Sequence, residues 1–120
     1  MASARQMIRL TIYIGEDKRH TELPLYEMII RKARQVHCAG ATVYRGIQGF
    51  GRSTRLHTVE VLFSEDLPIV IEIVDSPRKI TAFRRILEGM GEIGLVTSEP
   101  VECVQLCDEH DQDNLDRRSM

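Results

Sequence analysis

Residues 68–77 read PIVIEIVDSP, and this stretch decides the fold. Its three isoleucines alternate along an extended chain and share one face, whereas two valines flank Glu72 on the other face. Apolar side chains on both faces predict a strand that is buried on both sides. A helix is expected to follow at once, because Ser76 is a typical N-cap residue and Pro77 suits the first helical position.

The residues that follow predict one helix and then more strand. Apolar residues recur at spacings of three and four, which gives the helix one apolar face, and Gly89 and Gly91 are expected to end it. Two short strands are expected at Leu95–Thr97 and Val101–Cys107, with a turn between them at Ser98–Pro100. The predicted core face of the helix consists of Ile80, Phe83 and Leu87.

The residues before this stretch predict a strand, a helix and a second strand. Met7–Ile14 alternates between apolar and polar residues, as in a half-buried strand. A charged loop leads to a helix that has Pro24 in its first turn and Gly40 as its C-terminal cap. Ala41–Tyr44 resumes as a strand. The apolar stripe of the helix is Leu25, Met28, Ile29, Ala33 and Val36, and a strand-like return arm is expected at His57–Phe63.

The predicted element order is β-α-β-β-α-β, which is the split βαβ plan of a ferredoxin-like α+β fold. We therefore expect an antiparallel sheet with two helices on one face. Two helices cannot also cover the other face, and the strand Ile69–Val74 is apolar on both sides. The sequence predicts that this second face meets another subunit.

Composition indicates one soluble globular domain, placed at residues 1–107: the 120-residue chain has 42% hydrophobic and 28% charged residues. No segment has the pattern of a signal peptide or the ~18 apolar residues of a membrane span. Three cysteines without a framework spacing favour a reducing compartment, so a cytoplasmic location is expected. Residues 108–120 carry five acids against two arginines and are predicted to be a disordered acidic tail.

Residues 46–55 read GIQGFGRSTR and hold three of the eight glycines of the chain. From Met28 to Val59 there are six lysines and arginines and no acidic residue, which predicts a local positive field. Glycine lets a ligand approach backbone N–H groups, and arginine binds phosphate or carboxylate through a planar fork. We interpret the segment as a movable anion-binding loop; a glycine-rich hairpin with exposed arginines is the alternative. Its spacing matches neither the dinucleotide-binding nor the Walker fingerprint.

The same segment carries a family resemblance. Residues 49–52 (GFGR) resemble the turn that leads into the mobile T-loop of PII-like signalling proteins. Within that group the chain is most similar to domain-of-unknown-function family 190 (DUF190), over most of residues 7–106. The matching stretches are 12–16 (IYIGE), 24–26 (PLY), 40–43 (GATV), 45–51 (RGIQGFG), 57–58 (HT) and 67–75 (LPIVIEIVD).

This resemblance implies a compact PII-like homotrimer with nucleotide-sized clefts between its subunits. A small anionic metabolite, in particular an adenine nucleotide (AMP, ADP or ATP), would bind there, and no cofactor would be required. Binding would order a mobile loop at residues 52–67 and change the surface that a partner meets. The implied ligand-binding residues are Gly40, Ala41, Thr42, Gly49, Phe50, Gly51, Arg52, Gly91, Ile93 and Gly94.

The chain also departs from the PII-like pattern. PII proteins carry a lysine in the later glycine loop and arginines after the last strand, whereas Gly94–Val96 and Cys103–Cys107 contain no basic residue. Binding that depends only weakly on the third phosphate is therefore implied. Genes of family 190 often lie beside fluoride-channel genes, which implies a membrane channel or transporter as the regulated partner.

Metal binding is an alternative function. Glu16, Asp17 and His20, or His57, could hold a divalent cation, as in a cation-tolerance protein. A zinc site at Cys103-x3-Cys107-x2-His110 is disfavoured, because residues four apart in a strand are separated by ~13 Å.

Catalysis and nucleic-acid binding have less support. A small hydrolase would use His57 with Ser53, but the nearest acid, Glu60, lies on the same predicted movable arm and cannot orient a base. The protein is therefore not expected to be an enzyme. No nucleic-acid partner is expected either, because the basic segment is short and offers only Tyr44 and Phe50 for stacking.

Overall fold

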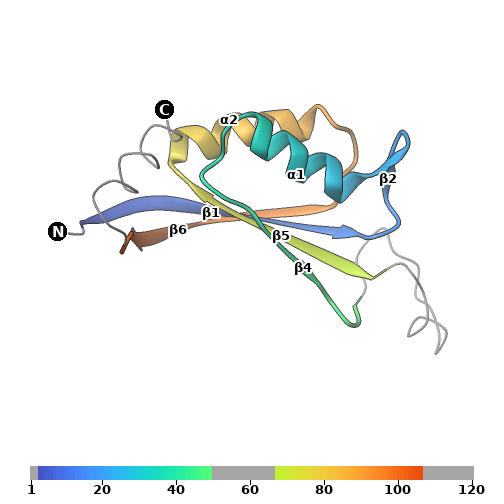
Figure 1. Ribbon diagram of the computed structural model, residues 1–120, viewed down its shortest axis with the longest axis horizontal. Coiled ribbons are helices and arrows are strands. Elements are labelled where there is room, and N and C mark those ends of the chain that lie inside the picture. The colour runs from blue at the N-terminus through green and yellow to red at the C-terminus, as the bar shows by residue number, and fades with distance from the viewer. Residues whose placement is uncertain (1–2, 50–66, 107–120) are drawn as a thin grey trace.

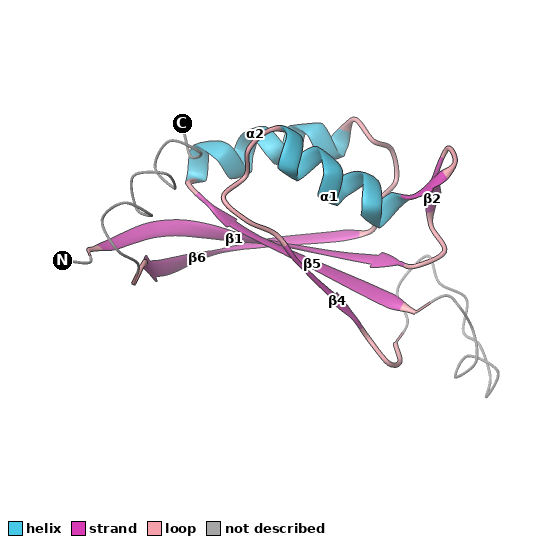
Figure 2. Ribbon diagram, in the orientation of Figure 1, coloured by secondary structure: helices cyan, strands magenta, loops and turns pink. Residues whose placement is uncertain are grey.

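The computed structural model describes residues 3–49 and 67–106. Within these residues, two helices lie on one face of a four-stranded antiparallel sheet with the strand order β4-β5-β1-β6 (Figure 1). The two helices form one layer and the four-stranded sheet the other, and β2 lies beside α1, away from this sheet (Figure 2). This arrangement confirms the predicted ferredoxin-like fold. The elements are β1 (Ala4–Gly15), β2 (Arg19–His20), β3 (Leu23–Pro24), α1 (Leu25–Gln35), β4 (Thr42–Arg45), β5 (Pro68–Asp75), α2 (Pro77–Glu88) and β6 (Leu95–Val104).

Strand β5 lies inside the sheet, and one of its faces is buried in the single chain, whereas Val70, Glu72 and Val74 on the other face are partly exposed. It pairs with β1 on one side and with β4 on the other, and its three isoleucines are at most 1% exposed. These side chains pack against the apolar stripes of both helices, and their removal from water is the main force that holds the layers together. The buried core comprises Leu10, Ile12, Ile14, Leu25, Ile29, Ala33, Ile69, Ile71, Ile73, Ile80, Phe83, Leu87 and Ile93.

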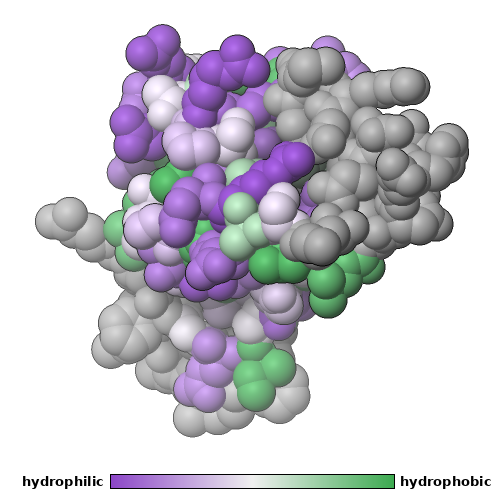
Figure 3. Space-filling view, turned by 90° about the vertical axis from the view of Figure 1, so that its left-hand side faces the viewer, coloured by the Kyte–Doolittle hydropathy of each residue, from purple (hydrophilic) through white to green (hydrophobic). Residues whose placement is uncertain are grey.

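The second face of the sheet carries exposed apolar side chains. The strand register aligns Leu95, Tyr13, Val70 and Tyr44 in one row across the four strands. Leu95, Tyr13 and Tyr44 are 62%, 43% and 51% exposed in the single chain. An end view shows hydrophilic residues predominating where the helices lie, and apolar patches mainly in the lower half of the molecule (Figure 3). The expected contact of this face with another subunit stays a prediction.

Helix α1 ends earlier than the sequence predicts. Gly40 is the predicted C-terminal cap, but the helix ends at Gln35. His37 instead adopts the left-handed conformation, with φ of 62°. The N–H of Cys38 donates to the carbonyl of Ala33 at 2.9 Å, which closes a Schellman-type turn. The prediction about Gly40 is therefore wrong, and Gly40 lies in the connection between α1 and β4.

The last strand also differs from the prediction. The sequence predicts two strands and a turn at Ser98–Pro100, whereas the structure has one continuous strand, β6. In the described sheet β6 lies at the edge and pairs with β1, where Pro100 is opposite Ile8. An edge strand tolerates proline, because its missing N–H can face away from the neighbouring strand.

Candidate ligand-binding site

A groove with a volume of about 650 Å³ lies at one end of the sheet. The first residues of β1, the last residues of β6 and the connection from α1 to β4 form its walls. Three of the predicted ligand-binding residues, Gly40, Ala41 and Thr42, line it together. Other lining residues that bear on ligand chemistry are Arg5, Met7, Glu72, Val74, Glu102 and Cys103.

The charged residues of the groove are of mixed sign. Arg5 is a cation, whereas Glu72 and Glu102 are carboxylates that accept hydrogen bonds and repel phosphate. Such carboxylates suit hydroxyl and amino groups, so this groove fits the uncharged part of a nucleotide better than its phosphates. The sequence analysis missed all three residues. The alternation of β1 could have placed Arg5 on the face opposite Leu10, but the neighbouring strands are set only by the fold.

Asp75 fixes the connection that forms one wall of the groove. Its carboxylate is fully buried and accepts hydrogen bonds from the N–H groups of Ala39 (2.9 Å) and Ser76 (2.7 Å). The Lys79 ammonium donates to the carbonyl of Val36 at 2.9 Å. The Ser76 hydroxyl caps α2 as predicted, by accepting from the N–H of Lys79. The end of β5 and the start of α2 therefore hold residues 36–39 and place Gly40–Thr42 beside the sheet.

Cys38 lies half-buried in the connection between α1 and β4, and the reactivity of its thiol tests the surroundings that the structure gives it. Burial raises the pKa of the Cys38 thiol, the charge of Asp75 raises it further, and Lys79 lowers it. A raised pKa leaves less thiolate at neutral pH, and the thiolate is the reactive form. In a C103S/C107S variant we expect iodoacetamide to modify Cys38 more slowly than a small model thiol at pH 7.5, with a rate that is still rising above pH 9. A rate equal to that of the model thiol would contradict this environment.

The first predicted glycine turn begins at the opposite end of the sheet. The N–H of Gly46 donates to the carbonyl of Pro68 at 2.7 Å. A Cβ atom on Gly46 would lie 2.6 Å from Cγ of Pro68, and one on Gly49 would lie 3.2 Å from it. Glycine therefore lets the chain pass tightly over the start of β5. The predicted residues Phe50, Gly51 and Arg52 lie outside the described residues.

The later glycine loop lies at the same end. Gly94 packs against the backbone of Tyr13, near the end of β1, with φ of 149°. Gly91 has φ of 94° and no atom near its missing side chain. The Ile93 side chain belongs to the buried core, so only backbone atoms of this predicted site residue can meet a ligand.

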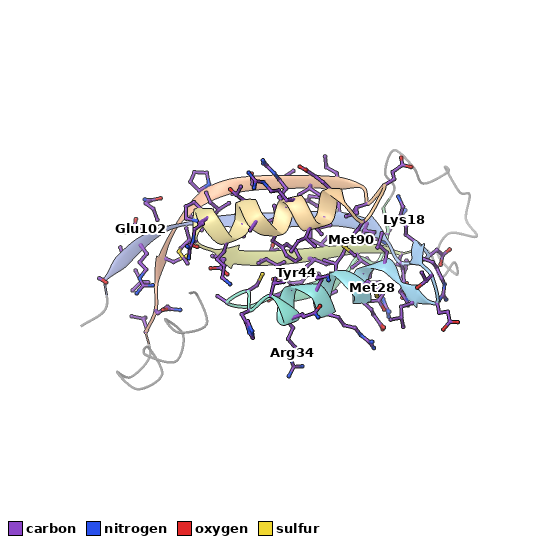
Figure 4. All side chains as sticks on the ribbon, turned by 90° about the horizontal axis from the view of Figure 1, so that it is seen from above. Lys18, Met28, Arg34, Tyr44, Met90 and Glu102 are labelled. Atoms are coloured by element: carbon purple, nitrogen blue, oxygen red, sulfur yellow. The ribbon has the colours of Figure 1, made fainter. Side chains whose placement is uncertain are left out.

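The described residues of the predicted ligand-binding set thus form two groups along the sheet. Met7 lines the groove, whereas Gly15 is level with Pro68 and the glycine turn. Eight residues of extended strand separate Met7 from that level, which is roughly 25 Å, whereas Thr42 is opposite Glu72, level with Thr11, and so lies four residues or roughly 13 Å from it. Glu102 and Lys18, which mark the two ends, lie far apart when the molecule is seen from above (Figure 4). A small ligand seated against Met7 therefore cannot also contact the glycine turns of the same chain.

The described cations of the basic segment 28–59 do not converge on the glycine turn. Three of them, Arg31, Lys32 and Arg34, belong to α1, and Arg34 points away from the body of the molecule (Figure 4). Arg45 forms an ion pair with Glu16. The positive field that the sequence predicts is therefore divided between two elements, and Arg52 and Arg55 lie outside the described residues.

Comparison with known proteins identifies the family. Residues 7–103 match DUF190, a family described as Uncharacterized ACR. The chain belongs to the DUF190 family. A UPF0166 protein of Aquifex aeolicus (strain VF5) is 33% identical to this DUF190 chain over 98 residues, which cover 81% of the chain and 92% of the relative.

Solved structures similar to the DUF190 chain include PII-like proteins. CPII from Thiomonas intermedia K12, bound to ADP, AMP and acetate, has a TM-score of 0.62 at 10% identity, over 84% of this chain and 91% of CPII. The apo form of CPII, a nitrogen regulatory PII-like protein, has a TM-score of 0.61 at 10% identity, over 88% of this chain and 100% of that one. At such low identity the likeness establishes the fold, which is PII-like.

The structure places the other candidate residues of the DUF190 chain as follows. Glu16 is engaged by Arg45. In residues 3–49 and 67–106, no three metal-ligating side chains form a cluster that could hold an ion. The candidate hydrolase residues Ser53, His57 and Glu60 lie outside these ranges. Cys107 and His110 of the disfavoured zinc motif also lie outside them. No helix within the same ranges is both long and apolar enough to cross a membrane.

Proposed function

We propose that this DUF190 protein is a trimeric, non-enzymatic PII-like regulator that binds an adenine nucleotide in clefts between its subunits. The groove at Gly40–Thr42 of one subunit would hold the base and ribose. The glycine turns and Arg52 of a neighbouring subunit would hold the phosphates. Binding would order residues 52–67 and so change the surface offered to a partner, for which a membrane channel or transporter is our candidate.

The separation of the two groups of predicted residues carries this proposal. In each chain the Met7 wall of the groove lies roughly 25 Å from the level of the glycine turns, and Thr42 lies roughly 13 Å from it. A second chain brings both groups to one ligand. The apolar row that includes Tyr13 and Tyr44 supplies a surface for that contact, because an uncovered apolar sheet face is a typical subunit interface.

The ligand class is supported by chemistry and by a fold neighbour. The carboxylates of Glu72 and Glu102 suit the hydroxyl and amino groups of a nucleoside. CPII, which shares the fold, has been solved with ADP and AMP bound. The basic residues that PII proteins direct at phosphates have no counterpart in Gly94–Val96 or Cys103–Cys107. We therefore propose that the third phosphate adds little to the affinity.

Native mass spectrometry of the freshly purified protein, followed by calorimetry with AMP, ADP and ATP, tests this function. The expected mass is three times the 13.7 kDa chain mass, and the expected heats give similar affinities for ADP and ATP. A monomer at micromolar concentration would remove the intersubunit site. A trimer that gives no heat with any of the three nucleotides would overturn the nucleotide assignment and favour the cation-binding alternative.

Replacing one arginine tests where the phosphate binds. We expect Arg52→Ala to weaken ADP binding by roughly ten- to a hundredfold, because a charge-assisted hydrogen bond contributes ~1.5–3 kcal/mol. Arg34→Ala is the matched control, since it removes an equal charge from a side chain on α1 that points away from the body (Figure 4). Calorimetry on both variants measures the effect, and equal losses would indicate a diffuse electrostatic contribution instead of a phosphate contact.

A further inference from the structure

The turn after β1 contacts the residue that precedes segment 46–67 and the last residue of that segment. The N–H of Glu16 donates to the carbonyl of Leu67 at 2.8 Å, which holds the segment that enters β5. The carboxylate of Glu16 forms an ion pair with Arg45, the last residue of β4. One residue therefore holds the point where the chain leaves the sheet and the point where it returns.

The strand order lets Glu16 contact both Leu67 and Arg45. Strand β5 lies between β1 and β4, so a side chain at the end of β1 must cross the start of β5 to reach Arg45. Pro68 starts β5 opposite Gly15, and the N–H of Gly46 donates to its carbonyl. The ion pair thus spans the same level of the sheet at which the glycine turn begins.

The backbone around Glu16 is itself held on both sides. The N–H of Lys18 donates to the carbonyl of Gly15 at 3.2 Å, and the N–H of Leu25 donates to the carbonyl of Lys18 at 2.7 Å, which ties the turn to the start of α1. The Glu16 side chain is 20% exposed, against 57% for Arg45. An isolated surface pair contributes little, because two mobile side chains must be ordered to form it. Here one partner is already ordered by its backbone and is partly shielded from water.

We propose that Glu16 is a positioning residue that anchors both ends of segment 46–67 and sets the direction in which the glycine turn leaves the sheet. The anchoring follows from the described contacts. Its effect on a ligand rests on the proposed function, since Gly49–Arg52 are expected to meet the phosphates only if that function holds. The alternative in which Glu16 helps to hold a divalent cation competes with this role, because its carboxylate is engaged by Arg45.

Limited proteolysis without any ligand tests the anchoring by itself. Trypsin fragments are identified by mass, and only the cuts after Arg52 and Arg55 are counted. We expect Glu16→Gln to speed these cuts about fivefold, because weaker anchoring raises the population of the open form that the protease cleaves. Glu88→Gln is the matched control: it removes a carboxylate from a surface pair with Arg84, 3.9 Å away on α2, and should leave the rate unchanged.

A charge swap separates positioning from a loss of general stability. The double variant Glu16→Arg/Arg45→Glu can re-form the pair, and we expect it to bring the cleavage rate back to within about twofold of the original protein. Unchanged cleavage in Glu16→Gln, or a swap that cleaves as fast as the single variant, would overturn the proposal. Calorimetry with ADP then measures the functional effect, with a three- to tenfold weaker affinity expected for Glu16→Gln, roughly the effect of losing one such contact. If the original protein binds no nucleotide, the proposed function fails while the proteolysis still decides the anchoring.

Discussion

Gly94→Ala is expected to lower the free energy of unfolding by about 3 kcal/mol, because it combines a steric overlap with an unfavourable backbone conformation. The added Cβ atom would overlap the carbonyl oxygen of Tyr13, which is backbone of the paired strand β1 and cannot rotate away. Gly94 also has φ of 149°, a value that residues with a side chain rarely adopt. Either the loop or the first pairs between β1 and β6 must shift.

Two other glycines of the predicted site serve as controls for this experiment. Gly40→Ala should change stability by less than about 0.5 kcal/mol, since nothing lies within 4 Å of the added atom and its φ is ordinary. Gly91→Ala should cost about 1 kcal/mol, from its φ of 94° in open space. Urea unfolding at one fixed protein concentration measures all three, because oligomer stability depends on concentration. Equal stability of the Gly94 and Gly40 variants would contradict the close packing against Tyr13.

Asp75→Ala is expected to cost about 3 kcal/mol as well, for an electrostatic reason. The buried carboxylate accepts hydrogen bonds from the N–H groups of Ala39 and Ser76. Alanine would leave both donors without their acceptor and would open a small cavity. The Ala39–Thr42 wall of the groove would lose its anchor at the end of β5, so ligand affinity should fall together with stability.

Asp75→Asn separates the loss of one accepted hydrogen bond from the loss of both. Asp75→Asn keeps one acceptor oxygen but turns an amide toward the other N–H, so we expect a loss of about 1–2 kcal/mol. Glu99→Ala is the surface control. Its carboxylate accepts a hydrogen bond from Arg9 at 2.9 Å, but both side chains are well exposed, and the change should be below about 1 kcal/mol. An Asp75→Ala variant as stable as Glu99→Ala would mean that water replaces the carboxylate without cost.

Much of the fold could be read from local patterns. The alternation of Ile69, Ile71 and Ile73, the cap at Ser76 and the two apolar stripes each depend on neighbouring residues, and all are found in the structure. The prediction of the last strand was wrong because distant residues decide its extent. Pro100 was predicted to break a strand, but it lies on an edge whose position depends on the pairing with β1.

The candidate site was predicted only in part, for the same reason. The glycine and arginine pattern indicated the glycine turn, and the resemblance to PII-like proteins implied Gly40–Thr42, but neither tells which residues of other strands lie beside them. Glu72 and Glu102 reach one groove from β5 and β6, which no spacing in the sequence relates. No sequence pattern singled out Asp75, whose two hydrogen bonds join separate elements.

By itself, the sequence determined the helices, most strands of the sheet and the ferredoxin-like order, because hydrophobic periodicity, capping and turn chemistry act over a few residues. The DUF190 membership follows from sequence similarity over residues 7–103. Tertiary structure alone decided which residues share a groove, that Glu16 engages Arg45 across the start of β5, and that the groove and the glycine turns lie at opposite ends of one sheet. Those facts depend on strand order and register, which are fixed only when all the apolar faces are buried together.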